Sequence, residues 1–117
     1  MIFNSGMAGE SAAVKFLKKS GYKILEKNYR KTYGEIDIIA KKGENIAFVE
    51  VKTRKSDLYG SPAEFVNKKK QERIIKTAYT YIQEHNLDAE FTFDIVEVHT
   101  EGIKIKSVNH IKNAFYI

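Results

Sequence analysis

Residues 34–54, GEIDIIAKKGENIAFVEVKTR, contain two strand-like segments separated by a short polar turn. The segments 34–41 and 45–54 are rich in Ile, Val, Phe and Ala, and their patterns favour strands. Gly43 and Glu44 between them suit a two-residue hairpin loop of type II′, which has glycine at its first position. This stretch therefore predicts an antiparallel hairpin.

The loop also predicts the register of the hairpin. If Lys42 faces Asn45, then Asp37 lies opposite Glu50 on one face of the sheet. The other face is apolar and pairs Ile36 with Val51, Ile38 with Val49 and Ala40 with Ala47. Two carboxylates placed across from each other repel unless a positive charge lies between them. A divalent metal ion would supply that charge.

Glu50 and Lys52 stand two residues apart, so their side chains share one face of the strand. Alone, such a pair is most simply a surface ion pair worth less than ~1 kcal/mol. The same register places Glu35 opposite Lys52 and adds a third carboxylate to this face. We therefore expect a cluster of charged groups rather than scattered surface residues.

Two helices and three further strands are expected around the hairpin. One helix is expected over residues 7–20, and a second is expected to end at about residue 85. The strands are expected over 22–30, 91–98 and 102–108. Ser61–Glu64 resembles a capping box, and Asn67 suits the start of a separate helix. This order predicts an α/β fold with a central mixed β-sheet: an antiparallel three-strand meander, then a parallel strand after a crossover helix, flanked by helices.

Two polar residues fall on helix faces that also carry apolar residues. Glu10 precedes apolar positions of the first helix by three, four and seven residues, and Gln71 precedes Ile74 and Ile75 of the second. The simpler roles are an interaction of Glu10 with the helix N-terminus and a bond from Gln71 to core backbone. Alternatively, both point toward the charged face of the hairpin.

The composition bounds the class of protein. A chain of 117 residues suits one domain over 1–117, and the absence of cysteine excludes disulfides, cysteine-ligated zinc and thiol catalysis. A net charge of +5 favours an anionic partner, nucleic acid before membrane. With no long apolar run and no signal pattern at the start, we expect a cytoplasmic protein without a membrane partner.

Several motifs together resemble a known family. GESAA near the start, GYKILEKNYR, GEIDIIA, FVEVKTR, SPAEFVNKKKQ and the later FDIVEV and NAF occur in the order found in the YraN family of proposed endonucleases. Asp37 followed by Glu50 and Lys52 also resembles the PD-(D/E)xK signature of the restriction-endonuclease-like superfamily, although Ile36 stands where that signature has proline. The family is similar in turn to archaeal Holliday-junction resolvases.

The resemblance implies roles for particular residues. Asp37 and Glu50 would bind Mg²⁺ or Mn²⁺, with the Val51 carbonyl and Glu10 as further ligands, and Lys52 would be the catalytic lysine. Glu10 and Gln71 would join these residues at the catalytic site. Glu35 would either bind metal or pair with Lys52.

The expected function is metal-dependent hydrolysis of DNA phosphodiester bonds, with branched or junction DNA in repair or recombination as one substrate. A homodimer is possible, because a junction requires two cuts. The alternative is a nucleic-acid-binding module of the same fold that cuts nothing unaided and acts with a partner. Under both, the nucleic-acid contacts are expected from Arg30, Lys31, Tyr33, Arg54, Lys55, Lys68, Lys69, Lys70 and Arg73.

Overall fold

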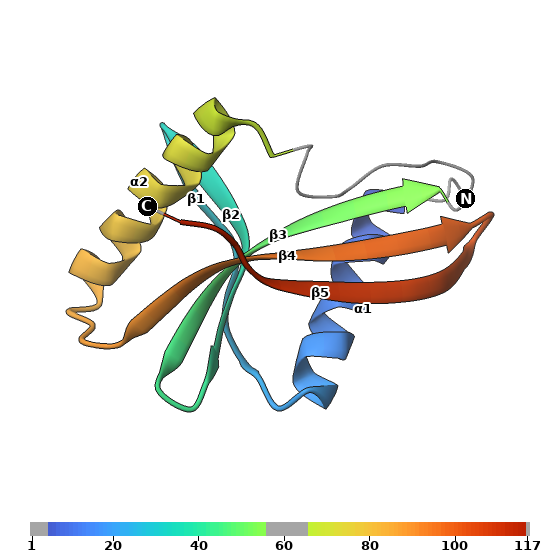
Figure 1. The fold of residues 1–117 in the computed structure, drawn as a ribbon, viewed down its shortest axis with the longest axis horizontal. Coiled ribbons are helices and arrows are strands. Elements are labelled where there is room, and N and C mark those ends of the chain that lie inside the picture. The colour runs from blue at the N-terminus through green and yellow to red at the C-terminus, as the bar shows by residue number, and fades with distance from the viewer. Residues whose placement is uncertain (1–4, 56–65, 117) are drawn as a thin grey trace.

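In the computed structural model, residues 5–55 and 66–116 are described, and they form an α/β fold around one five-stranded sheet (Figure 1). The elements are α1 (Ser5–Lys19), β1 (Lys23–Lys31), β2 (Gly34–Lys42), β3 (Asn45–Lys55), α2 (Lys68–Glu84), β4 (Glu90–Glu101) and β5 (Lys104–Phe115). The predicted order of elements is confirmed, with a last strand longer than expected. Neither helix among the described residues is both long and apolar enough to span a membrane.

The sheet is mixed, as predicted. Its strand order is β1-β2-β3-β4-β5, with β3 and β4 parallel and the other neighbours antiparallel. Figure 1 shows β3 and β4 running side by side in the same direction. The connection between them contains α2, because parallel neighbours require a crossover of this kind.

The predicted register of the β2–β3 hairpin is confirmed from Lys42 opposite Asn45 to Ile38 opposite Val49. Gly43 has φ +59, and Glu44 is not among the residues with positive φ, which fits the expected type II′ turn. The paired ladder ends at Ile38 and Val49. Beyond this end, the Val51 backbone N–H of β3 donates its hydrogen bond to the Asp37 side chain of β2 and not to the backbone of β2.

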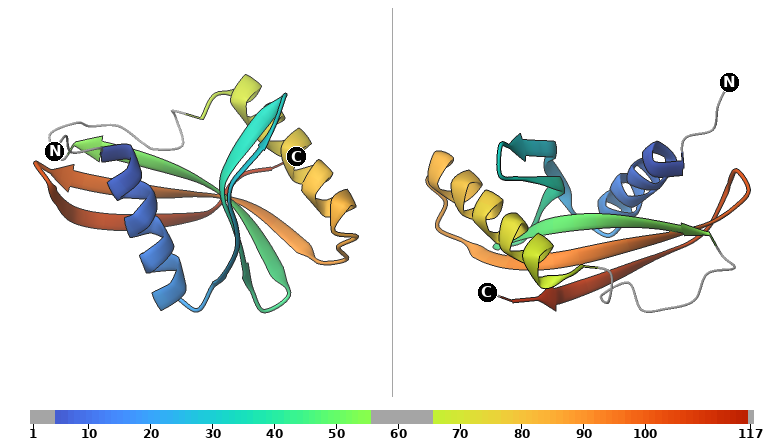
Figure 2. Two further views of the ribbon diagram at one scale, coloured as in Figure 1. Left: turned by 180° about the vertical axis from the view of Figure 1, so that it is seen from behind. Right: turned by 90° about the horizontal axis from the view of Figure 1, so that it is seen from above.

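The two faces of the sheet carry separate apolar cores, because side chains alternate along each strand. Ile38, Ala40, Ala47 and Val49 pack with Ala13 and Leu17 of α1, whereas Ile39, Ile46 and Phe48 pack with Ile74, Ala78 and Tyr81 of α2. Figure 2 shows α1 in front of the sheet and α2 beyond it when the molecule is seen from behind. Each helix therefore covers one face.

One predicted contact in the core is wrong. Ile36 belongs to the core beneath α2, whereas Val51 packs against the core beneath α1. The expected Ile36–Val51 pair does not form in the β2–β3 ladder, which stops two residues earlier. The strands separate where the charged residues begin.

Asn67 caps the start of α2, as expected, and its Oδ1 atom accepts a hydrogen bond from the Lys70 backbone N–H at 2.9 Å. The capping-box sequence Ser61–Glu64 lies outside the described residues. Of the C-terminal aromatic residues, Phe115 docks in the core, with its ring centroid 5.2 Å from that of Phe93. Tyr116 remains 73% exposed.

Candidate metal and phosphate site

Asp37 and Glu50 lie where β2 and β3 separate. The Val51 backbone N–H donates a hydrogen bond to Asp37 Oδ2 at 2.8 Å, which holds this carboxylate beside β3. Glu50, the residue before Val51, is 8% exposed. Both carboxylic residues line a cavity of about 450 Å³ between β2, β3 and the start of α2. The predicted pair of acids is thus brought together, although the two residues are not a backbone-paired position of the hairpin.

Two lysines approach the same oxygen of Glu50. Lys70 Nζ lies 2.6 Å from Glu50 Oε1, and Lys52 Nζ lies 4.0 Å from that atom. Lys52 comes from the same strand as Glu50, whereas Lys70 comes from the first turn of α2. The site therefore combines the two expected carboxylates and the expected lysine with a second lysine that we had assigned only to nucleic-acid binding.

The charges perturb one another strongly. Burial, together with the negative charge of Glu50, raises the pKa of Asp37 to about 7, although the bond from the Val51 N–H opposes this effect. Glu10 and Glu35 raise it further. The protein therefore holds an acid pair that its own cations neutralise only in part. Such perturbed acids in a cavity are typical of functional sites.

Lys52 is also perturbed. Burial lowers its pKa from the ordinary lysine value, and the positive charge of Lys70 lowers it further, whereas Glu50 acts in the opposite direction. Burial alone would lower the pKa of Lys70 too, but its bond to Glu50 and the negative charges of Glu50 and Asp37 together outweigh this effect and raise it. Lys52 is thus the lysine of this pair that releases a proton more readily.

The donor set suits a hard divalent cation. Among the described residues, no three His, Asp or Glu side chains gather as a metal cluster. Three carboxylates from this part of the chain line the cavity, and because Glu35 is bonded to Arg30, Asp37 and Glu50 are the candidate ligands. Mg²⁺ is commonly bound by one or two carboxylates, with waters and substrate phosphates as its other ligands. Asp37 and Glu50 fit that requirement. The Val51 carbonyl as a further ligand stays a prediction.

Glu10 and Glu35 occupy the edges of this site. Glu10 Oε1 accepts a hydrogen bond from Asn28 Nδ2 at 2.9 Å, and Glu10 lines a separate cavity at the start of α1. Its charge still acts on Asp37. Glu35 lines the acid cavity, but both of its oxygens bond to the Arg30 guanidinium at 3.2 Å. Glu35 therefore pairs with Arg30 and not with Lys52.

Gln71 does not line the acid cavity, and of its two expected roles the structure shows the simpler one, a bond to core backbone. Its amide nitrogen donates a hydrogen bond to the Val66 carbonyl at 2.8 Å, and its side chain lines a different cavity with Tyr79 and Tyr116. Lys68 lines that cavity as well. The helical spacing correctly placed Gln71 partly inward, but α2 is rotated so that Lys70 and Ile74, rather than Gln71, line the acid cavity.

Arg54 is also placed differently from the expected surface contact. Its Nε atom lies 3.0 Å from Glu97 Oε2, and its side chain is only 12% exposed. Glu97 also contacts His99 Nε2. Arg54 is thus part of a buried charged group on β3 and β4, whereas Lys55 after it is exposed at the strand end. This ion pair holds the Arg54 guanidinium against Glu97 and not at the surface where a phosphate contact was expected.

A basic groove adjoins the acid cavity. It has a volume of about 760 Å³ and lies between the β1–β2 hairpin and α2. Gly34, Glu35, Lys69 and Arg73 line both hollows. The basic side chains that line the groove are Arg30, Lys31, Lys69, Arg73 and Lys76. Most of the basic residues predicted to contact nucleic acid are therefore gathered beside the acids.

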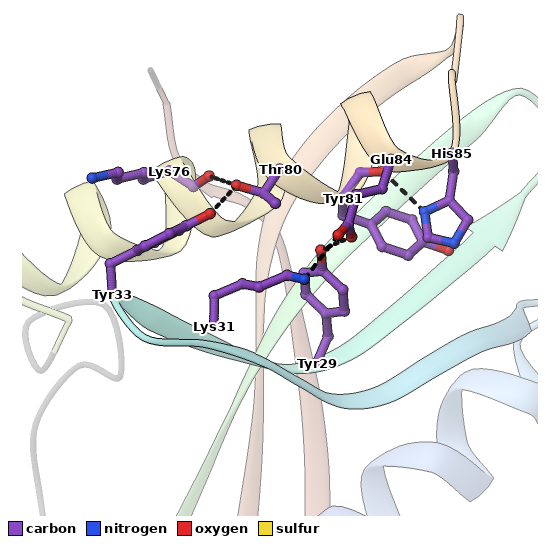
Figure 3. A network of polar contacts seen from close by, with 8 residues as sticks. All are labelled: Tyr29, Lys31, Tyr33, Lys76, Thr80, Tyr81, Glu84 and His85. Carbon is purple, nitrogen blue, oxygen red and sulfur yellow. Dashed lines mark hydrogen bonds and ion pairs between the residues drawn. The ribbon is translucent and has the colours of Figure 1, made fainter.

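One wall of the groove is fixed by a polar network (Figure 3). Tyr29 and Lys31 both bond to Glu84 near the end of α2, with Lys31 Nζ 2.8 Å from Glu84 Oε2. Tyr33 bonds to Thr80, and Lys76 Nζ lies 4.6 Å from the centre of the Tyr33 ring. Figure 3 shows these side chains bridging from the hairpin to the helix. Tyr33 and Lys31 thus hold the groove together as well as lining it.

Three further residues of the site escaped the sequence analysis. Asn28 adopts φ 53 and binds Glu10, and it falls between the β1–β2 pairs that flank Asp37. Gly34 lies so close to α2 that an added Cβ would stand 2.4 Å from Thr77 Oγ1. Similarly, a Cβ on Gly9 would stand 2.0 Å from Thr53 Oγ1. Gly9 and Gly34 each begin a motif, GESAA and GEIDIIA, which was the available signal. The residues they approach, Thr53 and Thr77, are distant in the sequence.

The chain was compared with known proteins. Residues 9–98 match the family model described as "Uncharacterised protein family UPF0102". A UPF0102 protein of Syntrophomonas wolfei is 45% identical over 94% of this chain and 96% of its own length. One of Clostridium botulinum (strain Kyoto / Type A2) is 49% identical over 96% and 94%, and one of Caldanaerobacter subterraneus is 48% identical over 94% and 93%. The expected membership is confirmed, and the chain belongs to the UPF0102 (YraN) family.

Proposed function

We propose that this protein is a metal-dependent endonuclease of the restriction-endonuclease-like superfamily that hydrolyses DNA phosphodiester bonds. The observation that carries the proposal is that Asp37 and Glu50 line one cavity, with Lys52 Nζ 4.0 Å from Glu50 Oε1 and the pKa of Asp37 raised to about 7 by burial and by the neighbouring acid. Carboxylates that repel each other at a binding cavity favour the binding of a cation.

The cofactor would be Mg²⁺ or Mn²⁺ held by Asp37 and Glu50. When bound, such an ion stabilises charge on the phosphate and helps to activate the attacking water. The bond from the Val51 N–H keeps Asp37 in place for this task. Two carboxylates leave room for waters and for phosphate oxygens of the substrate around the ion.

Lys52 would either take a proton from the attacking water or neutralise charge on the phosphate. Its lowered pKa makes the neutral amine more accessible, as a general base requires. In its charged form it would instead offset the negative charge that develops on the phosphate during cleavage. Both roles need the side chain at the acid cavity, and its 4.0 Å distance from Glu50 Oε1 supports this position.

The basic groove would bind the phosphate backbone of the same strand on one side of the cut. Lys69 and Arg73 line both the groove and the acid cavity. A DNA strand that runs from the groove into the cavity would therefore bring a phosphate to the two acids. Contacts of this kind are largely independent of sequence and weaken steeply with salt. We therefore propose structure-selective cleavage, with branched DNA as one candidate substrate and a homodimer as the form that cuts both strands of a junction.

The test is cleavage of labelled linear, single-stranded, flapped and four-way-junction DNA in Mg²⁺ or Mn²⁺. Wild type is compared with Lys52→Ala and Asp37→Asn, all purified identically so that a contaminating nuclease appears in every sample. The proposal requires metal-dependent cutting that both substitutions abolish. Binding without cutting by all three proteins would favour the alternative, a binding module that acts with a partner. Equal cutting by all three would reveal contamination and refute the assignment.

A further inference from the structure

The Glu50 carboxylate already contacts a cation that belongs to the protein. Lys70 Nζ lies 2.6 Å from Glu50 Oε1, close enough for a strong charge-assisted bond. The Glu50 side chain is 9% exposed, whereas that of Lys70 is 43% exposed. Lys70 thus reaches from the surface of α2 to a nearly buried acid, and both residues line the acid cavity.

A divalent ion on Glu50 would conflict with this arrangement. Lys52 also approaches Glu50 Oε1, at 4.0 Å. An added ion would bring its two positive charges beside two ammonium groups, where Asp37 and Glu50 carry two negative charges. Repulsion between like charges in a partly buried cavity is screened less than at an exposed surface. Binding of the ion therefore favours movement of the more exposed lysine, which is Lys70.

Lys70 borders a second group of charges, the basic side chains at the junction of the acid cavity and the basic groove. It lines the acid cavity together with Lys69 and Arg73, and these two neighbours also line the basic groove. The first turn of α2 carries no acidic residue. A lysine side chain has long, rotatable bonds and binds phosphate as a point charge. A phosphate held at the border of the groove and the cavity would lie within reach of Lys70 once it leaves Glu50.

We infer that Lys70 neutralises Glu50 in the free protein and transfers to a substrate phosphate when the divalent ion takes its place, so that metal and nucleic acid bind cooperatively. This inference rests on the proposed function, because it takes Glu50 as a metal ligand and a nucleic-acid phosphate as the substrate group. It adds a substrate-binding residue to Asp37, Glu50 and Lys52. It also explains why Lys70, the third lysine of the first turn of α2, bonds to a nearly buried acid.

Cooperativity of this kind must be reciprocal. If Lys70 hinders metal binding to the free protein, its removal strengthens metal binding in the absence of DNA. If Lys70 binds phosphate only after leaving Glu50, its removal weakens DNA binding mainly when the ion is present. Coupling between two ligands commonly changes affinity by about 5-fold to 150-fold. We expect roughly tenfold here, near the lower end of that range, since one flexible side chain carries the effect.

The experiment measures binding and not turnover. Mn²⁺ is titrated calorimetrically into wild type, Lys70→Gln, Lys68→Gln and Asp37→Asn without DNA. Binding of a short labelled duplex is then followed by fluorescence anisotropy in EDTA and in Ca²⁺, a hard cation that also prefers oxygen ligands. Lys68→Gln is the matched control, because Lys68 lies in the same turn and loses the same charge but lines a different cavity.

The inference predicts that Lys70→Gln binds Mn²⁺ roughly tenfold more tightly than wild type and gains less DNA affinity than wild type on adding Ca²⁺. Lys68→Gln should match wild type in Mn²⁺ affinity. If wild type has an Asp37-dependent site but a folded Lys70→Gln protein binds Mn²⁺ no more tightly than wild type, this inference is overturned and the proposed function is not. Absence of an Asp37-dependent site in wild type would overturn the proposed function and this inference together.

Discussion

Replacing Asp37 by Asn should stabilise the metal-free protein while removing its metal site. Asp37 lies in the acid cavity beside Glu50, and burial with that neighbouring charge raises its pKa to about 7. The folded protein therefore binds a proton at Asp37 more tightly than the unfolded chain does. Between about pH 4 and pH 7 the unfolded chain has lost this proton while the folded protein keeps it, so the stability of wild type falls as the pH rises until Asp37 of the folded protein ionises near pH 7. An uncharged amide avoids this loss, and its oxygen can still accept the bond from Val51 N–H.

The magnitude follows from the two pKa values. The difference between the ordinary value of 3.8 and about 7, at 1.36 kcal/mol per pH unit, gives a ceiling of about 4 kcal/mol above pH 7. Solvent in the open cavity screens the repulsion, so we expect about 2 kcal/mol at pH 8. At pH 4 the carboxyl is mostly protonated in the folded protein, and the difference should fall below about 1 kcal/mol.

The assay is urea denaturation of wild type and Asp37→Asn in EDTA at pH 4, 6 and 8, repeated at pH 8 with saturating Mn²⁺. Asp88→Asn, which makes the same chemical change at an exposed position, is the control and should show no such trend. Mn²⁺ at about 100 times its dissociation constant should stabilise wild type by about 2.7 kcal/mol and Asp37→Asn by much less. If Asp37→Asn is less stable than wild type at pH 8 in EDTA, the electrostatic explanation is wrong.

Three further substitutions test other parts of the site. Arg73→Glu should weaken DNA binding and reduce the dependence of log affinity on log salt by roughly one to two. Lys104→Glu, at the start of β5 and outside the lining of the groove and the cavity, should change the affinity much less, and anisotropy at several salt concentrations measures both. Gly34→Ala would place a Cβ 2.4 Å from Thr77 Oγ1 and 2.9 Å from the Arg73 carbonyl oxygen, so it should lower the free energy of unfolding by about 1–3 kcal/mol; an unchanged urea midpoint would show that α2 yields freely. Gln71→Ala loses the bond to the Val66 carbonyl and should cost about 1 kcal/mol of stability while calorimetry finds unchanged Mn²⁺ affinity; a lost Mn²⁺ site would return Gln71 to the catalytic group.

The fold was predictable because its signals are local. Alternating apolar residues identified the strands, and Gly43 at the hairpin turn set the register that the structure confirms from Lys42–Asn45 to Ile38–Val49. That register brought Asp37 and Glu50 to the same end of the hairpin. It could not show that the strands separate just there, because the separation depends on Asp37 accepting the Val51 N–H and on α2 lying above the gap.

The helix residues were predicted less well because helical periodicity does not fix rotation. Gln71 precedes Ile74 and Ile75 at the spacing expected for the inner face, yet it bonds to Val66 while Lys70 faces the acids. Arg54 stands two residues after Lys52 on β3 and was expected on the same face, yet Arg54 forms an ion pair with Glu97 of β4. Glu50 and Glu97, the partners of Lys70 and Arg54, are remote in the sequence from the residues that they bind, and no local pattern reveals these pairs.

The most direct test of the central claim is to locate the divalent ion itself. Crystals soaked in Mn²⁺ and measured near its absorption edge reveal the ion by anomalous scattering. We expect a peak bonded to one oxygen of Asp37 and one of Glu50, at about the 2.0–2.6 Å typical of hard cations on oxygen, with Lys70 moved away from Glu50. A crystal with an open acid cavity and no peak between these carboxylates, or a peak only elsewhere, would contradict the account.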